Sequence, residues 1–189
     1  MVYPLKVSLV TALLLLAACR SDPIQFHTLI PAQPGLAARN SGAEIQIEGI
    51  SVPPQVDRPQ IVIRQGNSGM AILETEWWAA SLVDELRSAL IDQMVNSNPR
   101  RNVSVRIEVQ RFDSIPGQYG LLDVKWRLRT SNGTENLMDI CRSTLQTPSG
   151  PSIDELVAAQ QNNVKRLAAL ISQAAAGTQK SCPSTNASQ

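Results

Sequence analysis

The chain has 189 residues and a mass of 20.5 kDa, and its 17 lysines and arginines nearly balance its 16 aspartates and glutamates. The formal net charge is only +1, and no block of lysine and arginine occurs, which disfavours a nucleic-acid-binding protein or a polybasic lipid-headgroup patch. The length suits one domain. We therefore expect partners to be recognised by shape and side-chain pattern rather than by net charge.

The N-terminus has the pattern of a bacterial lipoprotein leader. The twelve residues 7–18 carry no charge and follow Lys6. A helix needs about 20 apolar residues to cross a bilayer, so this run is typical of a secretory signal. It ends in Leu16-Ala17-Ala18-Cys19, which resembles a lipobox. We predict that residues 1–18 are removed as a signal peptide and that Cys19 is lipidated. The alternative is an ordinary signal peptide that happens to contain a cysteine.

The rest of the chain is predicted to form a tether, one domain and a tail. Residues 19–25 are the lipidated N-terminus and a short tether. The six tether residues 20–25 extend to at most about 20 Å and so keep the domain near the membrane. Residues 26–176 are predicted to fold as a single domain. Residues 177–189 are polar and are expected to form a mobile tail.

The first half of the domain has the pattern of short strands followed by a helix. Strand patterns occupy residues 26–30, 44–52, 60–64 and 70–73. Within 44–52 the apolar alternation changes phase at Gly49, which predicts a β-bulge. Apolar residues then recur every four positions from Trp78 to Met94, and this spacing predicts a helix over residues 76–96.

The second half is predicted to contain three strands and a helix. Residues 103–109 and 122–128 alternate apolar with polar side chains, as in an antiparallel sheet covered on one face. Asn132-Gly133 predicts a hairpin into a third strand over 135–146. Ser152 followed by Glu155 is a capping-box pattern that opens a helix to about Ala176. The predicted fold class is α+β, an antiparallel or mixed sheet with two long helices packed on one face.

Cys141 and Cys182 are candidates for a disulfide. An even pair of cysteines in an oxidising envelope compartment favours a bridge. The six residues after the predicted final helix are long enough to return Cys182 to the strand that contains Cys141. The alternative is a buried thiol at position 141 and an exposed thiol in the tail.

The sequence does not predict an active site. His27 is the only histidine, which excludes a two-histidine metal site within one chain, and its position in a predicted strand favours a structural role. Glycine-rich nucleotide-binding motifs are absent from the sequence. We therefore predict no metal, no cofactor and no enzymatic activity, with an envelope hydrolase as the disfavoured alternative.

Trp77 and Trp78 are adjacent, and only one of them can face the core of the predicted helix, where neighbours lie about 100° apart. Trp78 fits the apolar stripe. Trp77 is therefore predicted either to lie under a neighbouring loop or to be an exposed interface anchor, a role in which tryptophan is enriched.

Several motifs occur together along the chain. They are the lipobox, Phe26-His27-Thr28-Leu29, Val52-Pro53 followed by Asp57-Arg58-Pro59-Gln60-Ile61-Val62, Trp78-Ala79 with Leu82, Arg111-Phe112-Asp113, and Trp126. In this combination the chain resembles the PqiC/YmbA family, the auxiliary lipoproteins of ABC-type lipid transport systems that work with mammalian-cell-entry (MCE) proteins. The resemblance spans nearly the whole chain, although the cysteine-bearing tail is not part of the family pattern.

The resemblance implies a non-enzymatic role. Family members are membrane-anchored partners of periplasm-spanning MCE assemblies, which move phospholipid between membranes while another chain hydrolyses ATP. For this chain it implies an MCE-domain (PqiB-like) partner, a homo-oligomeric ring or collar, and Asp57, Arg58 and Trp77 as contact candidates. A solvated turn explains Asp57-Arg58 equally well.

The resemblance also bears on location. Aspartate after the lipidated cysteine commonly retains a lipoprotein in the inner membrane, and here that position holds Arg20. The implied location is the outer membrane, on the periplasmic side. The rival function is a stand-alone periplasmic carrier of a lipid or small apolar ligand, with its pocket between the helices and the sheet.

Overall fold

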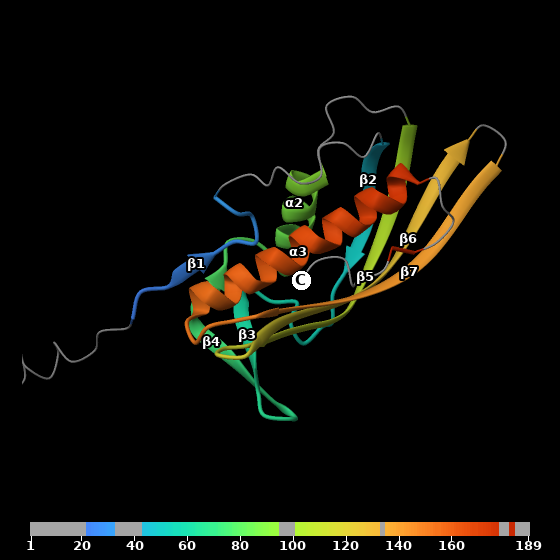
Figure 1. Ribbon diagram of the computed structural model, residues 1–189. Coiled ribbons are helices and arrows are strands. Elements are labelled where there is room, and N and C mark those ends of the chain that lie inside the picture. The colour runs from blue at the N-terminus through green and yellow to red at the C-terminus, as the bar shows by residue number, and fades with distance from the viewer. Residues whose placement is uncertain (1–21, 33–42, 95–100, 133–134, 178–181, 184–189) are drawn as a thin grey trace, which may run out of the picture.

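The computed structural model describes residues 22–32, 43–94, 101–132, 135–177 and 182–183, which form two sheets and two helices (Figure 1). The elements are β1 (Gln25–His27), β2 (Ala43–Ser51), β3 (Gln60–Gln65), β4 (Gly69–Trp78), α2 (Leu82–Met94), β5 (Arg101–Ile115), β6 (Tyr119–Asn132), β7 (Glu135–Pro148) and α3 (Ile153–Ala176). The fold class is α+β with mixed sheets, as the sequence predicts. The leader, and the tail apart from residues 177 and 182–183, lie outside the described residues.

The larger sheet has the strand order β2-β5-β6-β7. β5, β6 and β7 form an antiparallel meander, in which Ile107 lies opposite Trp126 and Trp126 lies opposite Cys141. β2 runs parallel to β5 at one edge, and its register shifts between Ile47 and Gly49, which confirms the predicted bulge. The parallel orientation is set by the long connection through β3, β4 and α2, so a local pattern does not reveal it.

The smaller sheet, β1-β4-β3, corrects two sequence predictions. The predicted helix over 76–96 starts too early, because Glu76–Trp78 are the end of β4, where they pair with Gln25–His27 of β1. α2 begins only at Leu82, after Ser81, whose hydroxyl accepts a hydrogen bond from the Asp84 amide (3.2 Å). Pairing with a distant strand overrides the apolar helical spacing of this segment.

The predicted strand over 26–30 is also shorter in the structure, where β1 ends at His27. From Thr28 onward the chain bonds to α2 instead of to β4. The Thr28 hydroxyl and the Leu29 amide both donate to one carboxylate oxygen of Glu85, each at 2.7 Å. Glu85 is buried, so these bonds fasten the segment after β1 to α2.

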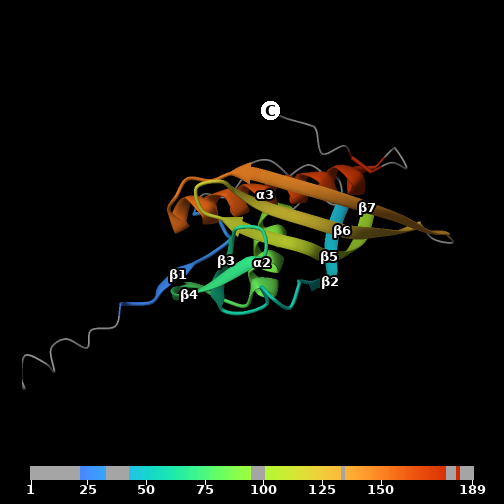
Figure 2. The same ribbon diagram turned by 90° about the horizontal axis from the view of Figure 1, so that it is seen from below.

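Both helices cover one face of the larger sheet, and the core lies between them (Figures 1 and 2). α3 begins at Ser152 with both halves of a capping box, which confirms that prediction. Large side chains from the sheet and the helices fill the interface, with exposed fractions of 1% or less. They include Ile107, Leu122, Trp126, Leu145, Leu86, Leu90, Leu167 and Ile171.

Two buried amides of α3 fix the helix against the turn between β5 and β6. Gln160 donates to the Asp113 carbonyl, and Asn163 donates to the Gly120 carbonyl, both at 2.9 Å. Gly120 allows this approach, because a Cβ there would lie 2.9 Å from the Gln160 side chain. These bonds satisfy polar groups that would otherwise be costly to bury, so they fix one register of α3 on the sheet.

Candidate functional site

A pair of aromatic rings lies where β1, the strand that follows the predicted tether, meets β4. Phe26 of β1 is 66% exposed, and its ring meets the Trp77 ring edge-on, with centroids 6.4 Å apart. The two residues are register partners in the parallel β1–β4 pair. The Trp77 indole N–H donates to the Glu74 carbonyl at 2.9 Å, which holds the ring in place. Phe26 is thus exposed and Trp77 partly exposed, close to the residues of the predicted tether.

Trp78 has the opposite orientation, as adjacent residues of a strand do. It is buried and packs edge-on against Phe112, with ring centroids 6.2 Å apart. The sequence prediction that Trp78 is a core residue is thus correct, and Trp77 is partly exposed. Its reasoning from a helix is wrong, because both residues belong to β4.

The loop with Asp57 and Arg58 lies beside the same strand end. The Trp78 amide donates to the Pro59 carbonyl at 2.7 Å, and Gln60 is the register partner of Trp77. Asp57 is exposed and Arg58 is partly exposed. The fold thus brings three contact candidates that are 20 residues apart in sequence to one end of the small sheet. Cys19, the candidate lipidation site, lies outside the described residues.

His27 connects this end of the small sheet to α3. Its Nε2 lies 2.6 Å from a Glu76 carboxylate oxygen, and its Nδ1 lies 3.4 Å from an oxygen of Asp154, in the first turn of α3. Both contacts join elements that are distant in sequence. They agree with the structural role that the sequence predicts for this histidine.

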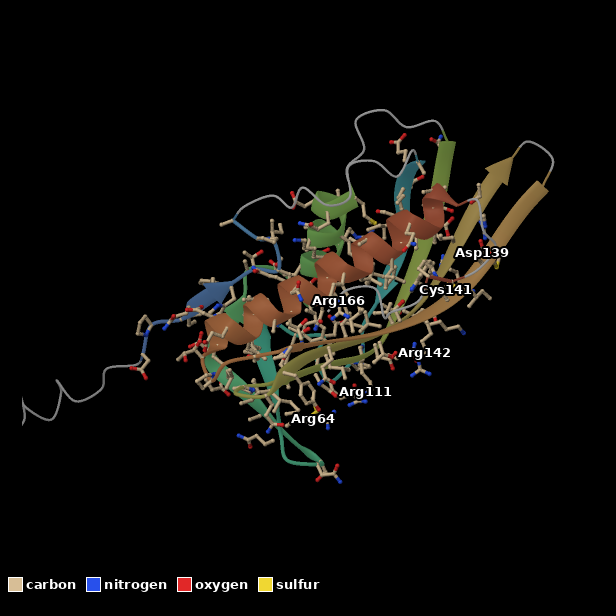
Figure 3. The ribbon with its side chains drawn as sticks, viewed as in Figure 1. Arg64, Arg111, Asp139, Cys141, Arg142 and Arg166 are labelled. Carbon is tan, nitrogen blue, oxygen red and sulfur yellow. A yellow bond between two sulfur atoms is a disulfide. The ribbon has the colours of Figure 1, made fainter. Side chains whose placement is uncertain are left out.

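Cys141 and Cys182 form a disulfide in the structure, with an S–S distance of 2.06 Å. Cys141 is buried on β7, and Cys182 lies beyond the C-terminal end of α3. The bridge closes a loop that contains the whole of α3 (Figure 3), so it fastens the chain after that helix to an edge strand of the larger sheet.

The face of the larger sheet opposite the helices carries rows of charged side chains, and Arg111 and Arg142 project from it (Figure 3). Asp123 lies almost buried on this face, 2.6 Å from the Arg142 guanidinium and 3.1 Å from the Thr144 hydroxyl. The hydrogen bond from Arg142 is the main cause that lowers the pKa of Asp123 from its ordinary value of 3.8, and burial opposes it.

This lowered pKa predicts a pH dependence of stability. The folded state binds fewer protons than the unfolded state near pH 3.8, so the stabilisation by Asp123 is present above that pH and is lost as the pH falls through the lower folded pKa. We expect Asp123→Asn to lower the free energy of unfolding by about 1–3 kcal/mol at pH 7. Denaturant unfolding at several pH values should show this difference shrinking below pH 3.8. Asp139→Asn, at an exposed aspartate of the same strand pair, is the charge-matched control.

The family model for the ABC-type transport auxiliary lipoprotein component matches residues 27–172. This chain belongs to that family. No protein of curated function matches the sequence. Membership assigns the chain a lipoprotein role in transport, and the family is not a known enzyme family. Among the described residues, no helix has the length and apolar character needed to cross a membrane.

Two crystal structures share the fold of this family member. One, of an uncharacterized protein, is 15% identical, with a TM-score of 0.59 over 81% of this chain and 99% of that chain. The other, of protein XCC0632 from Xanthomonas campestris, assigned to DUF330, is 16% identical, with a TM-score of 0.55 over 78% of this chain and 91% of that chain. At these identities the likeness concerns the fold alone.

Sequence reasoning missed two features of this family member. It did not pair Phe26 with Trp77, because the parallel β1–β4 contact joins residues 51 positions apart. It also did not predict that Arg106 of β5 lies opposite Arg127 of β6, although both predicted strands place charged residues on their outer face. The register between strands decides that contact, and the sequence alternation alone does not determine the register.

Proposed function

We propose that the protein is a non-enzymatic, membrane-anchored component of an MCE/ABC-type lipid transport system. Lipidated at Cys19 and carrying Arg20 after it, the protein sits on the periplasmic side of the outer membrane. There it docks a periplasm-spanning MCE assembly, with an MCE-domain (PqiB-like) protein as partner, as a homo-oligomeric ring or collar. Family membership supports the transport role, and the resemblance in sequence supports the partner and the location.

The pairing of Phe26 with Trp77 is the observation that carries the docking role. Phe26 is 66% exposed and Trp77 is partly exposed, and the Asp57-Arg58 loop adds polar groups beside the same strand end. Aromatic anchors surrounded by polar groups are typical of the energetic centre of protein interfaces. The closeness of the loop to the end of β4 supports a docking surface that includes Asp57, Arg58 and Trp77.

The stand-alone carrier is the second candidate, and the core gives it little support. A carrier of the kind predicted from the sequence needs a ligand pocket between the helices and the sheet. In the structure, that interface contains Trp126, Leu167 and Ile171, each 1% exposed or less, packed in one continuous cluster.

The docking role predicts that removing the aromatic anchor weakens partner binding. We expect Trp77→Ala to reduce affinity for an MCE-domain protein of the same bacterium about 30-fold or more, since interface hot spots contribute roughly 2 kcal/mol or more. Ile72→Ala removes a 43% exposed side chain from the same strand and should change affinity little. Light scattering of the full lipoprotein in detergent, alone and mixed with the partner, measures both assembly and binding.

A discrete oligomer or a stable complex with the partner is the expected result of this experiment. A strict monomer that does not bind the partner would contradict docking and would favour the carrier. Equal losses in the Trp77 and Ile72 variants would show that the aromatic pair is not the contact.

A further inference from the structure

A depression of about 190 Å³ lies on the face of the larger sheet opposite the helices. Its charged lining consists of three arginines and one glutamate, drawn from three neighbouring strands. The lining residues are Glu48 of β2, Arg106 of β5, Arg127, Leu128 and Arg129 of β6, and Met138 of β7. A local excess of positive charge is therefore concentrated in one hollow of a chain whose total charge is nearly balanced.

The bulge in β2 shapes this depression. Because of the register shift after Ile47, Gly49 is the strand partner of Arg106, and Glu48 is the extra residue. A Cβ added at Gly49 would meet no atom within 4 Å, so the space beside Arg106 is open. Because Gly49 has no side chain, it does not cover the aliphatic part of the Arg106 side chain.

The arginines face one another in an arrangement that opposes folding. Arg106 and Arg127 are direct cross-strand partners, and like charges in such positions destabilise a sheet. Arg127 has a carboxylate partner, Glu108, at 2.8 Å. Arg106 is exposed and has no ion-pair partner among the described residues. An anion bound between the two guanidinium groups would remove this repulsion.

The existing ion pairs leave the arginines free to bind a ligand. Arg129 lies 3.6 Å from Glu48, and both side chains are well exposed, at 55% and 31%. Exposed pairs of this kind contribute little to stability, so a stronger acceptor can displace them. Guanidinium groups bind phosphate through two parallel hydrogen bonds, which makes phosphate a better acceptor for several arginines than one carboxylate.

The border on β7 is apolar. Met138 and Ile140 are the strand partners of Arg129 and Arg127, and they are 55% and 54% exposed. A free phosphate ion has no apolar part that could contact this border, whereas the glycerol and acyl part of a phospholipid can lie along it. The volume is below the roughly 300 Å³ of small drug-sized ligand sites, so it suits a headgroup rather than a whole lipid.

We propose that this depression binds the phosphate of a phospholipid headgroup, with Arg106 as the principal contact and Arg127 and Arg129 beside it. Met138 and Ile140 then line the path of the lipid's apolar part. The inference goes beyond docking and rests on the geometry of the sheet. The site is on the larger sheet, whereas the docking candidates belong to the smaller sheet and the loop before it.

The test measures equilibrium binding of two water-soluble probes, glycerophosphoethanolamine and inorganic phosphate, to the full lipoprotein in a neutral detergent by titration calorimetry. Arg106→Gln should weaken glycerophosphoethanolamine binding roughly ten- to hundred-fold, the range for losing a charged hydrogen-bonded contact. Gly49→Leu, which fills the depression without changing charge, should weaken it as well. Lys125→Gln removes one exposed positive charge from the same face outside the depression and should change binding less than about two-fold.

Three results would overturn the proposal. The first is the absence of saturable binding of either probe to the unmodified lipoprotein. The second is equal weakening by Arg106→Gln and Lys125→Gln, which would indicate general charge attraction. The third is inorganic phosphate binding as tightly as glycerophosphoethanolamine, which would make the site one for free phosphate. Light scattering with the MCE-domain partner is a separate measurement, so failure here and failure of docking are distinguishable.

Discussion

Replacing Cys19 with alanine is expected to abolish lipid attachment and membrane anchoring. Each buried CH₂ contributes about 0.8 kcal/mol to membrane binding, so two or three acyl chains hold a protein essentially permanently, whereas a protein without them dissociates. The twelve-residue apolar run before Cys19 is shorter than the roughly 20 residues that span a bilayer and should not replace the anchor. We expect nearly all of the wild-type protein, and almost none of the Cys19→Ala variant, to sediment with membranes after an alkaline wash.

Mass spectrometry of the N-terminal peptide makes this prediction specific. The wild-type protein should begin at residue 19 and carry acyl chains, and it should fractionate with the outer membrane. Cys182→Ser is the control, because it removes another cysteine and should leave acylation unchanged. A mature N-terminus elsewhere, or an unacylated Cys19, would refute the lipoprotein signal and support an ordinary signal peptide.

Removing the Cys141–Cys182 bridge is expected to have the largest effect on stability. The bridge joins residues 41 positions apart, and a loop of that size constrains the unfolded chain by about 4 kcal/mol in the chain-entropy model. Cys182→Ser should therefore lower the free energy of unfolding by about 2–4 kcal/mol, a large part of the 5–15 kcal/mol typical of a domain. The melting temperature should fall by roughly 5–15 °C.

Two measurements check the bridge itself. Titration of the folded, unreduced protein should detect no reactive thiol at positions 141 and 182, and two thiols would contradict the disulfide. A reducing agent should lower the melting temperature of the unmodified protein to that of Cys182→Ser and should leave the variant unchanged. Cys182 is the better residue to replace, because Cys141 is buried and a serine there would add the cost of an unsatisfied hydroxyl.

The elements that local patterns encode were predictable from the sequence. The capping box at Ser152, the bulge at Gly49 and the alternation on β5 and β6 each depend on a few neighbouring residues, and the structure confirms all three. The start of the helix predicted at residue 76 was wrong because contacts with distant residues decide the structure of this segment. Its first residues have a helical apolar spacing, but β1 and β3 bind them as a strand.

The candidate surfaces were also predictable only in part from the sequence. The sequence singled out Trp77, Asp57 and Arg58, and the fold places them together, but it did not reveal Phe26 as the ring that packs on Trp77. The opposition of Arg106 and Arg127 was equally hidden, since it depends on the register between β5 and β6.

The sequence by itself determined the class of the protein: a leader ending in a lipobox, a domain of alternating strands and capped helices, and no visible catalytic motif. Only the tertiary structure decided where α2 begins, which strands run parallel and which charged side chains meet. The physical reason is separation along the chain. Caps, bulges and alternation arise from interactions within a few residues, whereas β1 meets β4 across 51 positions and β2 meets β5 across 58, and such contacts depend on the packing of the whole domain.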